Sequence, residues 1–298
     1  MTRTGDRGGP GRNPKNLVAN LKPVVPLEVS PNRWTRKSPA DEVLNVERNV
    51  KALLNDLTME KFDSTSDLII EWANRSEAES DARTLIHVIR LVFEKAVDDA
   101  ACSKMYALLC RKMMDAISPN VQDDGIRNVD GKPIAGGQLF RKYLLNRCQE
   151  DFECGWAART SRGAAINKAA KTSDELELHS NEYGATQEAR RQGLGLVQFI
   201  GELYKVQMLT ERIMHECIKK LLATTGNPGQ EEIESVYRLL TTVGKLLDNL
   251  KARPHMDIYF TRMEEWGKRT DVLPRLKLML QVGSAVYVWP IISSCFFT

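Results

Sequence analysis

Apolar residues recur with a helical spacing over most of the chain, from Asp41 to Gln281. They fall at positions i, i+3, i+4 and i+7, the pattern of a helix with one buried face. Short polar segments separate these stretches, so neighbouring helices are expected to run antiparallel. The predicted pairs are 41–55 with 58–74, 78–97 with 101–117, 138–156 with 183–207, 210–223 with 230–248, and 254–267 with 271–281.

The pairs recur about every 40 residues, which is the period of HEAT-type repeats. One repeat cannot bury its apolar face alone, and stacked neighbours share a continuous core. No run of alternating β-branched residues interrupts the series. The sequence therefore predicts an all-α fold, an α-α superhelix (HEAT-like solenoid) of about five antiparallel helical pairs.

Two insertions break the period. Residues 118–137 are rich in Pro, Gly and Asp and predict a long exposed loop. Residues 157–182 carry four basic residues without an intervening acid, followed by three acids. That block predicts either a mobile linker or a charged helical extension. In solenoids such insertions gather on one face, often the binding face.

The N-terminal residues 1–40 differ from the rest in composition. They hold six of the twelve prolines and a net charge of +6, with few apolar side chains. Such a segment cannot offset its ordering entropy by burial, which predicts a disordered basic leader. Its charge suits an acidic partner such as RNA, or it is merely solvated. No stretch reaches the roughly 18 apolar residues of a membrane span, and the start is not a signal peptide.

Residue types that perform chemistry are present without the spacing that chemistry requires. The six cysteines form no C-x-x-C pair, and five fall within apolar helical patterns, which favours reduced thiols in the cytoplasm or nucleus. The four histidines lack a zinc-binding spacing. Gly193 and Gly195 imitate part of a dinucleotide-binding loop, but no third glycine or preceding strand accompanies them. The sequence predicts no enzyme, no catalytic residue, no metal site and no cofactor.

Candidate binding residues lie on surfaces instead. Basic residues around 190–220 could neutralise phosphates without reading base sequence, or could simply be solvated; they are Arg190, Arg191, Lys205, Lys219 and Lys220. The turn LNDLT should place Leu54 and Leu57 at an exposed corner, with Phe62 one turn into the next helix. These residues predict a partner patch, or else they close the end of the first repeat. Trp34 is an isolated aromatic in the leader, either a binding anchor or a chance occurrence.

Several blocks of sequence carry a family resemblance. In order they are KALLNDLTMEKFDSTSDLII, TLIHVIRLVFEKA, GGQLFRKYLLNRCQEDFE, FIGELYKVQMLTERIMHECIKKLL and RLLTTVGKLLDN, with RLKLMLQ near the end. Together, over about residues 30–281, the chain resembles the middle domain of eukaryotic translation initiation factor 4 gamma. The resemblance implies a non-catalytic HEAT crescent that holds the two lobes of a DEAD-box RNA helicase and promotes ATP-dependent unwinding near the cap.

The resemblance also implies particular contacts. Leu54, Asn55, Leu57 and Phe62 match the corner that binds one helicase lobe, and Trp34 matches a tryptophan that reaches the helicase. Phe199 would serve either packing or helicase contact. The five basic residues named above are expected to contact mRNA, and the multisubunit initiation factor that bridges to the 40S ribosome is a further expected partner. The implied protein is monomeric and cytoplasmic. A related HEAT-repeat adaptor, of mRNA decay or nuclear cap binding, is the alternative.

The residues after Gln281 depart from the family pattern. The segment 282–298, VGSAVYVWPIISSCFFT, lacks the expected helical and basic continuation. We hypothesise that this atypical tail is intron-derived. Transcript sequencing across codon 281 tests the hypothesis, and continuous coding sequence through Thr298 in mature mRNA would contradict it.

Overall fold

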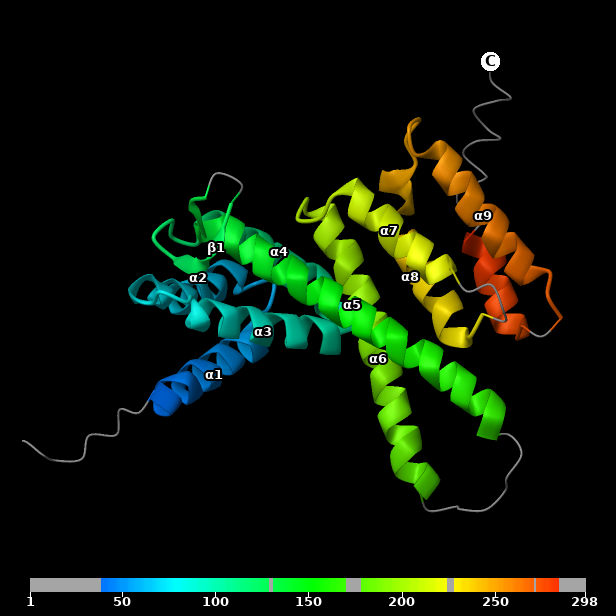
Figure 1. The fold of residues 1–298 in the computed structure, drawn as a ribbon, viewed down its shortest axis with the longest axis horizontal. Helices are drawn as coiled ribbons and strands as arrows, with labels where there is room; N and C mark the ends of the chain where they lie inside the picture. Colours follow the sequence, from blue (N-terminus) through cyan, green and yellow to red (C-terminus); the bar gives the residue numbers. More distant parts are fainter. Residues whose placement is uncertain (1–38, 129–130, 170–177, 224–227, 271, 284–298) are drawn as a thin grey trace, which may run out of the picture.

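The computed structural model describes residues 39–128, 131–169, 178–223, 228–270 and 272–283 (Figure 1). Its helices form the successive pairs that the sequence predicts, which confirms the all-α solenoid. The pairs are α1 (Pro39–Asp56) with α2 (Phe62–Asn74), α3 (Arg83–Asp98) with α4 (Ser103–Ala116), α5 (Gly136–Ala169) with α6 (Leu178–Lys205), α7 (Glu211–Leu222) with α8 (Gln230–Leu247), and α9 (Arg253–Gly267) with a helix at 274–283. Within the described ranges, no helix combines the length and apolar character that crossing a membrane requires.

Helix α6 packs against helices of both neighbouring pairs. It contacts α3 and α4 on one side and α8 on the other. Its approach to α3 is so close that a Cβ at Gly195 would stand 1.9 Å from the carbonyl oxygen of Val97. The glycine that imitated a nucleotide-binding loop therefore serves helix packing.

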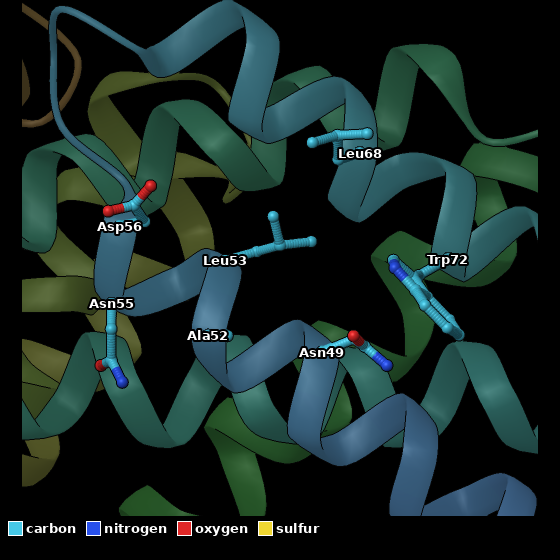
Figure 2. Close-up of a pocket in the computed structure, with 7 residues that line it drawn as sticks. All are labelled: Asn49, Ala52, Leu53, Asn55, Asp56, Leu68 and Trp72. Carbon is cyan, nitrogen blue, oxygen red and sulfur yellow. The ribbon is translucent and has the colours of Figure 1, made fainter.

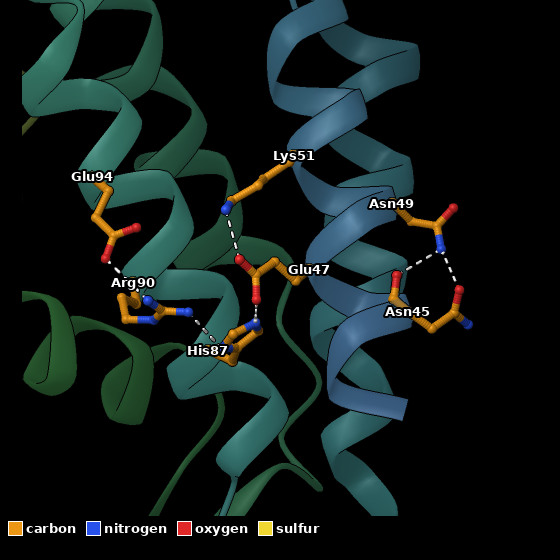
Figure 3. A network of polar contacts seen from close by, with 7 residues as sticks. All are labelled: Asn45, Glu47, Asn49, Lys51, His87, Arg90 and Glu94. Carbon is orange, nitrogen blue, oxygen red and sulfur yellow. Dashed lines mark hydrogen bonds and ion pairs between the residues drawn. The ribbon is translucent and has the colours of Figure 1, made fainter. Parts of the chain in front are cut away.

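A network of polar side chains joins α1 to α3 (Figure 3). The carboxylate of Glu47 accepts a 2.6 Å hydrogen bond from Lys51 and lies 3.7 Å from Nε2 of His87. Arg90 lies 3.2 Å from both the ring of His87 and the carboxylate of Glu94. Burial lowers the pKa of His87, so the neutral imidazole is favoured in this network. The contacts fix the first helical pair against the second.

The first insertion contains a β-hairpin, so the prediction of a loop without strands is wrong. Strand β1 (Gln122–Arg127) pairs antiparallel with β2 (Pro133–Ala135). The hydroxyl of Tyr143, on α5, donates a hydrogen bond to the carboxylate of Asp123 and attaches the hairpin to the helices. Neither strand shows the alternation that marks a strand in sequence, because only Ile126 and Ile134 are large and apolar.

The second insertion is helical where the structure describes it. Helix α5 continues to Ala169 and α6 begins at Leu178, and their ends project from the rest of the molecule (Figure 1). Of the two alternatives, the charged helical extension therefore applies to these residues; 170–177 lie outside the described chain. Residues 1–38, with most of the predicted leader, and 284–298, with most of the atypical tail, also lie outside it.

Candidate functional site

The corner between α1 and α2 does not expose its leucines. Leu54 is 2% exposed and Leu57 is 5% exposed, and both belong to the hydrophobic core. Leu54 follows Val46 and Val50 at helical spacing, so it shares their buried face of α1. The expectation of an exposed apolar patch at these two residues is wrong. They close the end of the first repeat, the other reading that the sequence allowed.

What the corner presents to solvent is the mouth of a groove between α1 and α2 (Figure 2). Asn55 and Asp56 lie at the corner end of this groove, whereas Leu53 and Leu68 reach into its middle and Trp72 lies towards its other end. Leu68 is 47% exposed. The open pocket has a volume of about 510 Å³ and is lined by Asn49, Ala52, Leu53, Asn55, Asp56, Leu68 and Trp72. We call these residues the α1–α2 groove.

Two aromatic side chains of α2 are each contacted by a cation. The guanidinium of Arg75 lies 3.6 Å from the ring centroid of Trp72 and stacks on it. The ammonium of Lys112, on α4, lies 5.8 Å from the ring centroid of Phe62 and 2.8 Å from the carboxylate of Asp67. Phe62 is half-buried against the core, so the predicted contact residue is positioned by α4 and presents only part of its ring.

Phe199 is fully buried, which decides between the two roles that the resemblance left open. Its ring packs against Phe93, on α3, so it is a core residue and presents no surface to a partner. Trp34, the remaining predicted helicase contact, lies outside the described residues.

The five predicted RNA-binding cations do not form one free basic face. Each lies within ion-pair distance of a carboxylate: Arg190 with Glu234 at 2.6 Å, Arg191 with Glu188 at 2.7 Å, Lys205 with Glu202 at 2.9 Å, Lys219 with Glu216 at 3.2 Å, and Lys220 with Glu153 at 2.7 Å. Arg190 points to α8, while Arg191 also lies 3.5 Å from Asp98 at the end of α3. The structure therefore distributes these residues over separate surfaces.

Buried polar clusters in the described residues have structural roles. Nδ1 of His215 lies 3.1 Å from the hydroxyl oxygen of Tyr259, and the rings of His215 and His255 are 5.2 Å apart. These contacts join α7 to α9. Across the described ranges, no group of three His, Cys, Asp or Glu residues is arranged to hold a metal ion. Burial raises the pKa of the Cys110 and Cys148 thiols, so both favour the unreactive protonated form.

Sequence reasoning missed the α1–α2 groove. Leu53, Leu68 and Trp72 fit the apolar helical pattern and therefore looked like core residues. The sequence held one sign of the groove, because α1 and α2 carry more apolar residues than one buried helix face accommodates. Leu44 is also on α1 and is exposed outside the groove, so this signal alone does not select the groove residues.

Comparisons with known proteins agree with this architecture. Residues 47–285 match the family model described as the MIF4G domain. The chain is 46% identical over 291 residues to eukaryotic translation initiation factor 4 gamma of Schizosaccharomyces pombe, and the match covers 93% of this chain and 20% of that protein. It is 36% identical to eukaryotic translation initiation factor 4 gamma 3 of Homo sapiens, which covers 92% of this chain and 17% of that protein.

A relative from Saccharomyces cerevisiae, eukaryotic initiation factor 4F subunit p130, is 40% identical over 76% of this chain and 26% of its own length. Among solved structures, the MIF4G domain of a Trypanosoma cruzi translation initiation factor has a TM-score of 0.51 and 16% identity, with 81% of this chain and 94% of that chain covered. That likeness concerns the fold. The chain spans about a quarter or less of the named relatives from yeasts and human.

These matches confirm the resemblance drawn from the sequence blocks, and they agree with the prediction that the chain is not an enzyme. Over most of its length the chain is similar to eukaryotic translation initiation factor 4 gamma proteins, and it belongs to the MIF4G domain family, whose model matches residues 47–285.

Proposed function

We propose that this chain is a non-catalytic scaffold of translation initiation that binds the two lobes of a DEAD-box RNA helicase and contacts mRNA. Its site of action is the cytoplasm, and it works as a monomer. The relatives named above are initiation factors, which supports this reading over a related adaptor of mRNA decay or nuclear cap binding. Contact with the multisubunit factor that bridges to the 40S ribosome remains part of the proposal.

The observation that carries the helicase contact is the α1–α2 groove, which opens at the corner with the sequence LNDLT. An apolar floor with amide and carboxylate groups at its lip suits a protein partner, because apolar anchors supply affinity and the polar lip orients them. Leu54 and Leu57 then support the corner from the core. Asn55 and Leu68 make the contact.

The physical effect on the helicase follows from rigidity. A scaffold that touches both lobes binds one relative orientation better than others, and the population of that orientation rises by the difference in binding free energy. ATP turnover increases if the favoured orientation is an intermediate between the open and closed states. No catalytic group of the scaffold is needed.

The test measures the ATPase rate of a DEAD-box initiation helicase with single-stranded RNA, with and without this chain. The variant Leu68→Glu places a charge in the groove, whereas Leu44→Glu places the same charge on α1 outside the groove, where the side chain is 58% exposed. Leu54→Ala is unsuitable, because truncating a buried leucine costs about 2–5 kcal/mol of stability. Circular dichroism establishes that each variant is folded.

We expect wild type and Leu44→Glu to stimulate the helicase and Leu68→Glu to bind it about tenfold more weakly, in line with the loss of an interface anchor. If the folded wild-type chain has no effect on the helicase, the result favours the alternative function, a related adaptor of mRNA decay or nuclear cap binding. Equal stimulation by both variants would show that the helicase binds elsewhere on the scaffold.

A further inference from the structure

Helices α6 and α8 lie side by side and in parallel. Arg190 pairs with Glu234, and eight residues later Gln198 lies opposite Thr242, with the hydroxyl oxygen of Thr242 3.4 Å from Oε1 of Gln198. The constant offset of 44 residues shows that the two helices keep the same register over these turns. At Gly201 a Cβ would stand 2.9 Å from Cγ2 of Thr242, so the helices remain close.

The carboxylates of this region are buried beneath their cations. The side chain of Glu234 is 8% exposed, whereas that of its partner Arg190 is 25% exposed. Glu202 and Lys205 repeat the arrangement at the end of α6, with exposed fractions of 8% and 37%. Solvent therefore meets the cation of each pair more than the carboxylate.

Further cations extend this arrangement along α8. Arg238 and Lys245 are exposed and stand seven residues apart, so they lie on one stripe of the helix about 10.5 Å apart along its axis. No ion pair with a carboxylate in the described part of the chain is recorded for either side chain. Besides Glu234, the acidic residues of this stretch are Glu231 and Glu232 in the first turn of α8 and Asp248 directly after its end.

The last helix adds one more cation near Glu234. Burial acts to raise the pKa of Glu234, but the hydrogen bonds from Arg190 and Gln230 and the charges of Arg190 and Arg275 outweigh it and lower the pKa. These contacts and charges favour the ionised form of Glu234. We call five cations of this region the α6–α8 seam: Arg190, Lys205, Arg238, Lys245 and Arg275. The region contains two buried carboxylates, those of Glu202 and Glu234.

The paired cations of α7 provide a contrast. Lys219 and Lys220 have side chains 47% exposed, but their partners Glu216 and Glu153 are 58% and 47% exposed. In each pair the carboxylate is at least as exposed as the lysine, so those pairs present almost no net positive charge to a ligand. In the seam, by contrast, the cations of the two ion pairs are more exposed than their carboxylates.

We infer that the α6–α8 seam is the surface that binds the phosphate backbone of single-stranded RNA. This inference rests on the RNA contact in the proposed function and names the residues that make that contact. Arg238 and Lys245 take the place that the sequence analysis gave to Lys219 and Lys220. Cations on one stripe neutralise phosphates without reading bases, so the binding is insensitive to sequence and sensitive to salt.

The experiment measures fluorescence anisotropy of a labelled poly(U) oligonucleotide titrated with the full chain over a series of salt concentrations. The seam variant carries Arg238→Gln and Lys245→Gln, and the matched control carries Lys219→Gln and Lys220→Gln, with the same change in net charge. We expect the seam variant to bind on the order of tenfold more weakly at about 0.1 M salt, with the slope of log affinity against log salt reduced by about 1.4 for two lost contacts. The control should stay close to wild type, and the swap Arg238→Lys with Lys245→Arg should retain binding.

Wild-type affinity in the folded seam variant, or an equal loss in the control, would overturn the assignment. No binding by wild type would overturn both the assignment and the RNA half of the proposed function. The ATPase experiment with Leu68→Glu tests helicase binding independently of RNA binding, because the α1–α2 groove and the α6–α8 seam share no residue.

Discussion

The ring of Phe199 meets the ring of Phe93 edge-on, with centroids 6.1 Å apart and planes at 72°. This contact joins α6 to α3, two helices whose aromatic residues are separated by more than a hundred positions in the chain. Edge-to-face pairs of this kind add to the stabilisation that burial of the rings already provides.

Truncation of Phe199 is expected to destabilise the fold. Phe199→Ala should lower the free energy of unfolding by about 3–5 kcal/mol, because it removes a fully buried ring and leaves a cavity. Urea denaturation followed by circular dichroism measures the change. Leu250→Ala is the control, since Leu250 is 86% exposed, and it should alter stability by less than about 0.5 kcal/mol. A small effect of Phe199→Ala would contradict the buried position of the ring.

Two glycines of α6 should respond in opposite directions to the same substitution. A Cβ at Gly195 would meet the backbone of Val97, whereas a Cβ at Gly184 has no neighbour within 4 Å. We expect Gly195→Ala to destabilise the protein by several kcal/mol, since backbone must move, and Gly184→Ala to stabilise it by up to about 1 kcal/mol through helix propensity. Thermal unfolding of the two variants beside wild type decides the matter, and similar melting temperatures would refute the close approach of α6 to α3.

Acid should weaken the contact between α7 and α9 through His215. Burial lowers the pKa of this imidazole. The carboxylate of Glu211, 3.5 Å from Nε2, offsets the lowering in part, and His255 and Lys219 add to it. Because the pKa in the folded state lies below the ordinary histidine value of 6.5, the unfolded chain binds more protons in this range. Stability is therefore lost as pH falls through 6.5 towards the folded pKa, at no more than about 1.4 kcal/mol per pH unit for this proton.

The measurement is the urea midpoint of wild type and His215→Gln at a pH above and a pH below 6.5. His215→Gln should lose less stability on acidification than wild type. The wild-type loss includes His87, whose pKa burial also lowers, so only the difference between the two proteins reports on His215. An identical loss in both proteins would show that His215 does not supply the acid sensitivity.

The helical pairs were predictable because their signal is local. Leu85, Val88, Ile89 and Val92 in α3 are spaced as one helical face and are all buried. The hairpin at 122–135 was not predictable from the sequence, because contacts with residues of other elements hold its strands in place. The hydrogen bond between Tyr143 and Asp123 joins residues from different elements, and no period in the sequence reports it.

Predicting the candidate sites required knowing which side chains face the core and which face solvent. The periodicity of the sequence does not settle this for neighbouring apolar residues. Leu54 and Leu53 are consecutive and equally apolar, yet the first is buried in the core and the second lines the groove. The cations show the same limit. Lys220 finds Glu153 across 67 positions in sequence, so counting nearby acids could not reveal its neutralisation.

The packing of α6 has a consequence for how the chain is held together. Residues 39–169 contain α3 and α4, and residues 178–283 contain α6, which buries its apolar face against both. The C-terminal end of α5 at Ala169 and the N-terminal end of α6 at Leu178 lie away from that shared core (Figure 1). The two halves of the chain are thus joined through a shared buried interface of α6 with α3 and α4, at a distance from the described ends of α5 and α6.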